Sequence, residues 1–76
     1  MQLNNFQAIA VLNAMHALNN VGGSIRVTFT PTIEGDKVIK VQECEDTGII
    51  SVIVGLRCVE RYETQQDFAE DYGLNY

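Results

Sequence analysis

Apolar side chains between Asn5 and Asn20 recur every three or four residues, a spacing that predicts an amphipathic helix. The apolar sector covers about two thirds of this helix, whereas a surface helix of a small domain needs a stripe of only about 100°. The chain also contains no Asp, Glu, Lys or Arg before Arg26. The excess apolar surface must therefore be covered by the C-terminal segment, by a second copy of the chain or by a target protein.

Both ends of this helix carry recognisable signals. Asn4 is a suitable N-cap, and Gln7, three residues later, completes a variant of the capping box. Asn19 and Asn20, followed by Gly22 and Gly23, supply residues that accept positive φ and end the helix.

After the helix the apolar pattern changes to every second residue, which predicts strands. The predicted strands are Ile25–Thr30, which Pro31 ends, Lys37–Glu45, which follows a loop of residues 32–36, and Ile49–Val59. The last of these is apolar on both faces, so both faces require cover. Gly55 in its middle marks a bulge or a close backbone approach, or is neutral.

The last segment, Tyr62–Tyr76, has the pattern of a short helix. Thr64 and Asp67 form a second capping pair, and Phe68 and Tyr72 lie one helical turn apart. The expected fold is a single domain of residues 1–76 in the α+β class. An N-terminal helix packs on a three-stranded antiparallel sheet in two layers, followed by a short C-terminal helix.

Composition restricts the function classes. The 76 residues are 46% hydrophobic and 20% charged, with a net charge of −5, which is typical of one small globular domain. The negative charge argues against direct binding of nucleic acid and favours a protein partner with a basic surface. No apolar run approaches the length of a membrane span, so we expect a cytoplasmic protein that does not contact membranes.

The residues that could take part in catalysis or metal binding lack the neighbouring residues that these functions require. His16, the single histidine, has no nucleophile and orienting carboxylate near it in sequence. The acids around Glu43–Asp46 do not follow the spacing of a calcium loop. We expect no catalytic residue, cofactor or metal. Cys44 and Cys58 are too far apart on the predicted hairpin for a disulfide and are interpreted as reduced thiols, Cys58 as a small core residue.

Half of the acids lie in the last seventeen residues, interleaved with tyrosines. Acidic side chains steer association with a basic surface, and tyrosines serve as rigid interface anchors. The same pattern also fits an amphipathic helix whose aromatic side packs on the sheet. The candidate partner-binding residues are Glu60, Glu63, Asp67, Glu70, Asp71, Tyr72 and Tyr76.

This order of elements, together with the acidic tail, resembles the small acidic anti-CRISPR proteins that bacteriophages encode. The resemblance covers the topology and composition of most of the chain and involves no shared motif. It implies a non-enzymatic inhibitor that occludes the nucleic-acid-binding surface of a larger complex by mimicking DNA, in the cytoplasm of the host cell.

The alternative is a homodimeric structural or interaction module without an inhibitory role. It would bury the excess apolar surface between two copies. The candidate interface residues are Ile9, Met15, Ile49 and Ile53. A small enzyme or metal protein is a third reading.

Overall fold

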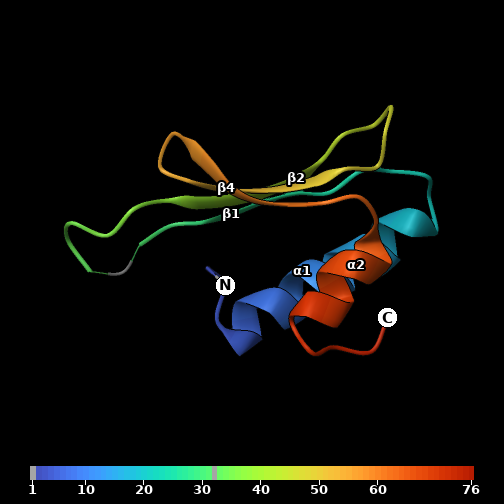
Figure 1. Ribbon diagram of the computed structural model, residues 1–76, viewed down its shortest axis with the longest axis horizontal. Coiled ribbons are helices and arrows are strands. Elements are labelled where there is room, and N and C mark those ends of the chain that lie inside the picture. Colours follow the sequence, from blue (N-terminus) through green and yellow to red (C-terminus); the bar gives the residue numbers. More distant parts are fainter. Residues whose placement is uncertain (1, 32) are drawn as a thin grey trace.

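The computed structural model describes residues 2–31 and 33–76, so Thr32 of the predicted loop lies outside the described residues. The described chain folds into two layers, an antiparallel sheet and a pair of helices that both lie on one of its faces (Figure 1). The strands follow one another in space in the order β1-β2-β3-β4. The elements are α1 (Asn5–Asn19), β1 (Arg26–Phe29), β2 (Ile39–Glu43), β3 (Ile50–Val54), β4 (Arg57–Tyr62) and α2 (Gln65–Asp71).

Helix α1 begins with the predicted capping box. The Asn4 side chain accepts a hydrogen bond of 2.8 Å from the Gln7 backbone N–H, and the Gln7 side chain accepts one of 3.0 Å from the Asn4 backbone. At the other end, Gly22 adopts a φ of +74° and the Gly23 N–H donates to the Leu18 carbonyl at 2.9 Å. These bonds satisfy backbone groups that a helix end leaves unpaired.

The first hairpin has the predicted alternation. Val27 of β1 lies opposite Val41 of β2, which in turn lies opposite Val52 of β3, and these three side chains point toward the helices. Lys40 and Gln42 point to the opposite face, as the sequence predicted. The strands are shorter than predicted, because the residues near Lys37 and Cys44 belong to the connecting loops.

The prediction of three strands was wrong, because the segment Ile49–Val59 folds into two. Gly55 and Leu56 form a tight turn between Val54 and Arg57, which face each other across the new hairpin. Gly55 has a φ of +65°, while Leu56 is not among the residues with positive φ. A glycine with positive φ at the first central position is typical of a type II′ turn, whose twist matches that of a hairpin.

A β-bulge in β4 determines which residues face the helices. Glu60 pairs with Val52, but Cys58 pairs with the next residue, Ile53, so Val59 is an extra residue in β4. The bulge returns Cys58 to the face away from the helices, where it is exposed. The prediction of Cys58 as a core residue was therefore wrong, whereas both cysteines are free thiols as expected.

The core lies between the sheet and the two helices. It combines one side of α1, the inward positions of the middle strands and the aromatic side of α2. Its fully buried members include Ala8, Val11, Met15, Ile25, Val41, Ile50, Val52, Phe68 and Ala69. Helix α2 thus covers part of the excess apolar surface. This is the first of the three expected forms of cover, the C-terminal segment.

Within the described residues, the sheet face opposite the helices is bare (Figure 1). We call this surface the open face. The register places on it the side chains of Arg26, Thr28, Lys40, Gln42, Ser51, Ile53, Cys58 and Arg61.

Candidate interaction site

The Glu60 carboxylate joins three parts of the chain. It accepts hydrogen bonds from the Tyr72 hydroxyl at 2.6 Å, from the Tyr62 hydroxyl at 2.8 Å and from the Gln2 backbone N–H at 3.1 Å. The Tyr72 oxygen also accepts a bond of 3.3 Å from the Leu3 N–H. We call Glu60, Tyr62 and Tyr72 the tyrosine–carboxylate cluster; it ties β4 to α2 and to the residues before α1.

The aromatic rings of the cluster pack around Phe68. The Tyr62 ring meets the Phe68 ring edge-on, with centroids 5.4 Å apart, and the Tyr72 and Phe68 centroids are 4.9 Å apart. Edge-on and tilted ring pairs at these distances are favourable. Phe68 is fully buried, so the cluster connects the hydrophobic core to the acidic surface above it.

Burial and hydrogen bonding shift the pKa values of the cluster in opposite directions. Burial raises the pKa of Glu60, but hydrogen bonds from Tyr72, Tyr62 and the Gln2 backbone outweigh it and leave the pKa below its usual value. Burial, followed by the hydrogen bond to Glu60, raises the pKa of Tyr72 to about 12. Burial and the bonds to Asp71 and Glu60 raise the pKa of Tyr62 as well. The ionised carboxylate and the neutral phenols therefore stabilise each other.

The structure thus gives Glu60 and Tyr72 partners within the chain. Both side chains are half-buried, and their polar atoms are engaged by one another. Asp71 is exposed but lies 2.7 Å from the Tyr62 hydroxyl oxygen, whose single proton it shares with Glu60. These three predicted contact residues hold α2 in place.

The other predicted acids form an exposed surface. Asp67, Glu70 and Asp71 have the i, i+3, i+4 spacing that places side chains on one side of a helix. Glu63 precedes the N-cap Thr64, whose hydroxyl accepts a hydrogen bond of 3.0 Å from the Asp67 N–H, as predicted. We call Glu63, Asp67, Glu70 and Asp71 the acidic face of α2; all four are exposed.

Tyr76 lies against the end of α1. Its ring meets the His16 ring edge-on at 5.3 Å, and its hydroxyl donates a hydrogen bond of 2.7 Å to the Gln65 side chain. Gln65 also donates to the side chains of Asn19, at 3.0 Å, and Glu43, at 3.1 Å. Sequence reasoning missed this network, because Gln65 meets α1 and β2 only after the chain has folded.

The four predicted dimer residues do not share one surface. Met15 is fully buried in the core, so it does not reach a second copy, and this part of the prediction is corrected. Ile9 is 38% exposed on α1, whereas Ile49 and Ile53 are half-buried at the sheet. Because Ile53 is on the open face and α1 lies on the other side of the sheet, one interface does not bury both Ile9 and Ile53 (Figure 1).

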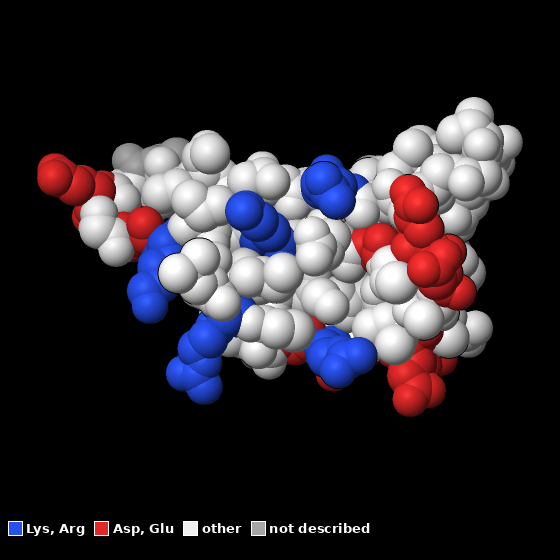
Figure 2. Space-filling model, turned by 90° about the horizontal axis from the view of Figure 1, so that it is seen from above, with Lys and Arg blue, Asp and Glu red and all other residues white. Residues whose placement is uncertain are grey.

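The open face is a second polar surface, which sequence reasoning missed. Three of the five bases in the chain, Arg26, Lys40 and Arg61, belong to it and are exposed. Figure 2 shows basic side chains over the middle of the molecule and acidic side chains gathered toward its ends. The alternating pattern predicted outward positions for Arg26 and Lys40, whereas Arg61 lies beyond the predicted third strand, and the strand register that aligns the three bases was not predicted.

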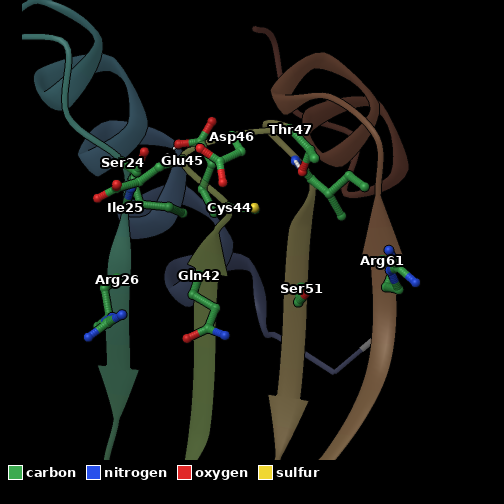
Figure 3. A pocket seen from close by; sticks show the side chains of 12 residues that line it. Ser24, Ile25, Arg26, Gln42, Cys44, Glu45, Asp46, Thr47, Ser51 and Arg61 are labelled. Atoms are coloured by element: carbon green, nitrogen blue, oxygen red, sulfur yellow. Dashed lines mark hydrogen bonds between the residues drawn. The ribbon is translucent and has the colours of Figure 1, made fainter.

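One end of the open face is hollowed. A concavity of about 810 Å³ is lined by Arg26, Gln42, Ser51 and Arg61 from the four strands and by residues 44–47 of the β2–β3 turn (Figure 3). In this turn, hydrogen bonds from the Thr47 side chain and backbone lower the pKa of the exposed Cys44 thiol.

Two further features bear on function class. Neither helix in the described part of the chain is long and apolar enough to cross a lipid bilayer. Among residues 2–31 and 33–76, no group of three or more His, Cys, Asp and Glu side chains is arranged to hold a metal ion.

Comparisons with protein-family models, curated proteins and solved structures give no match.

Proposed function

We propose that the protein is a non-enzymatic inhibitor that binds through the acidic face of α2 to a basic surface of a larger complex in the cytoplasm. The nucleic-acid-binding surface of that complex is the target that best fits a cluster of carboxylates. The resemblance to anti-CRISPR proteins belongs to this proposal, with a defence nuclease as the complex.

The observation that carries the proposal is the fixed position of an exposed row of carboxylates. The carboxylates of Glu63, Asp67 and Glu70 are exposed, while the tyrosine–carboxylate cluster joins α2 to β4. A surface that is rigid before binding loses less conformational entropy when it binds. Carboxylates on such a surface also accelerate encounter with a basic partner.

The test is reversal of charge on this surface alone. The variant E63K/D67K/E70K leaves the tyrosine–carboxylate cluster intact, and E34K/D36K/E45K is a control with the same net charge at exposed loop acids. Affinity capture from the native host, quantified by mass spectrometry, should give a protein that wild type and control retain and the α2 variant loses. The association rate with that protein should fall in the α2 variant and lose its salt dependence. Equal retention by both variants would remove the acidic face of α2 as the contact.

A homodimer is the second candidate, supported by the outer side of α1. Phe6 is 83% exposed on this helix, one helical turn from Ile9, and the helix contains no Asp, Glu, Lys or Arg. Sedimentation of wild type and Phe6→Ser at micromolar concentrations tests this function. A wild-type monomer at all concentrations would exclude it.

A further inference from the structure

We propose that the open face is a second binding site, which takes an extended acidic peptide segment of a partner protein. Arg26 and Arg61 would each bind one carboxylate of that segment. This site is separate from the acidic face of α2, and the inference does not depend on the function proposed above.

The strand register places the two arginines in one row. Arg26 pairs with Gln42, Gln42 with Ser51, and Ser51 with Arg61, so this row crosses all four strands. Neighbouring strands lie about 4.8 Å apart, which separates the Arg26 and Arg61 backbones by about 14 Å. Figure 3 shows the two arginines on the outer strands with Gln42 and Ser51 between them.

The shape of this row suits a bound segment. Both arginines are exposed, whereas the shorter Gln42 and Ser51 side chains are half-buried and form the floor of the concavity. Their amide and hydroxyl groups can bond the backbone of a segment lying across the strands. Lys40, in the neighbouring row, adds a third positive charge.

The charged side chains on and around the open face favour one position for a bound acidic segment. The register places no Asp or Glu of the described strands on the open face, although the chain carries a net charge of −5. Glu43 also lines the concavity at the end of β2, where its carboxylate accepts a hydrogen bond of 3.1 Å from Gln65, and Glu45 and Asp46 stand on the rim in the β2–β3 turn. These three carboxylates repel an acidic segment from this end and favour its position over Lys40 and the arginines.

The chemistry of the face favours a peptide over a nucleic acid. None of its side chains is aromatic, so it has no platform on which bases would stack. An extended peptide rises about 3.3 Å per residue and points alternate side chains to the same side, so carboxylates four residues apart span about 13 Å. That spacing matches the separation of Arg26 and Arg61, and guanidinium groups bind carboxylates in a bidentate manner.

The experiment is a titration of the ¹⁵N-labelled protein followed by NMR. The probe is a peptide of Ser and Thr with two glutamates four residues apart, and the control peptide carries glutamines instead. We expect amide shifts at Arg26, Gln42, Ser51 and Arg61 with the glutamate peptide only. Binding should weaken about tenfold or more in R26E/R61E. It should stay within about twofold in K37E/R57E, which has the same net charge and alters the two bases outside the open face.

Several results would overturn the inference. Equal weakening in both variants, or equal binding of the glutamine peptide, would show that the arginines do not bind carboxylates. Amide shifts confined to α1 or α2 would place the peptide elsewhere. Tighter binding of an oligothymidylate than of the peptide would indicate a nucleic acid, and open-face shifts that follow protein concentration without peptide would indicate a second copy of the chain. The variant E63K/D67K/E70K should still bind the peptide, so failure of the function proposed for α2 and failure of this site are distinguishable.

Discussion

The Tyr72 hydroxyl donates a hydrogen bond of 2.6 Å to the Glu60 carboxylate and thereby fastens the end of α2 to β4. The same carboxylate accepts the Gln2 N–H, so residues near both ends of the described chain meet at one acceptor. In a domain of 76 residues, which buries only about 60% of its unfolded surface, such a polar connection supplements a small core.

The Glu60 carboxylate should make folding stability depend on pH in the acid range. Its pKa is lowered in the folded state, so its contribution is complete above the ordinary glutamate pKa of about 4.3 and is lost as pH falls through the folded value. We expect Glu60→Gln to cost about 1 kcal/mol at neutral pH, because the half-buried group is partly screened by solvent, and to flatten this dependence. Urea unfolding at several pH values measures both effects; parallel pH profiles for wild type and variant would contradict the role of Glu60.

The half-buried phenols of Tyr62 and Tyr72 should make the fold sensitive to alkali. The pKa of Tyr72 is raised to about 12, so the folded chain keeps a proton that the unfolded chain releases near pH 10. Stability is therefore complete below about pH 10 and falls as pH rises toward about 12. Tyr72→Phe should reduce this loss, as judged by unfolding at several alkaline pH values, and tyrosinate absorbance should lose the component that titrates near pH 12, while the raised pKa of Tyr62 keeps a later component. An unchanged absorbance titration in the variant would show that Tyr72 is not the component near pH 12.

Two phenylalanines of opposite exposure should respond very differently to truncation. Phe68 is fully buried, and Phe68→Ala should cost about 3–5 kcal/mol, a loss comparable to the whole stability of a domain this small. Phe6→Ala is the matched control at 83% exposure and should change stability by no more than about 0.5 kcal/mol in a monomer. Thermal unfolding compares the two directly. A costly Phe6→Ala would instead point to an interface on α1.

The turn between β3 and β4 depends on Gly55. Its φ of +65° lies in the left-handed region, so Gly55→Ala should cost about 1–2 kcal/mol. The neighbouring Leu56 is fully exposed, and Leu56→Ser should be neutral within about 0.5 kcal/mol. Chemical unfolding of the two variants separates backbone strain from loss of apolar contact. A neutral Gly55→Ala would argue against a positive φ at this turn.

The Cys44 thiol should react faster when Thr47 is present. Hydrogen bonds from Thr47 lower the pKa of Cys44, and the thiolate is the reactive form. Thr47→Val should slow alkylation of Cys44 near neutral pH, while exposed Cys58 serves as an internal reference. Mass spectrometry of iodoacetamide adducts over time measures both rates. Equal slowing of the two cysteines would exclude a specific effect of Thr47.

Local signals predicted the helices well, because their ends depend on neighbours in sequence. The Asn4–Gln7 box and the Thr64–Asp67 pair each act over three residues, and both form. The split of the third strand was missed because the apolar alternation continues through the turn. Ile50, Val52, Val54 and Leu56 keep one period in sequence, although the chain reverses at Gly55.

The acidic face of α2 and the open face depend on long-range contacts that the periodicity of the sequence does not predict. Spacing alone placed Asp67 and Glu70 on one side of α2, but the engagement of Glu60 required α2 to fold back on β4. The alignment of Arg26 with Arg61 likewise depends on the register of three strand pairs. The strand register and the packing of α2 on β4 could not be predicted from residue types alone, and both sites depend on them.

The extra residue in β4 also divides this strand into two parts that should evolve under different rules. Deletion of the Val59 codon would remove the bulge and leave Cys58 opposite Ile53 and Glu60 opposite Val52, so every pair of this hairpin would be kept. A deletion between Glu60 and Tyr62 would instead turn the partners of Tyr72 and Asp71 away from α2. Single-codon deletions among natural variants should therefore be tolerated at Val59 and be absent after it.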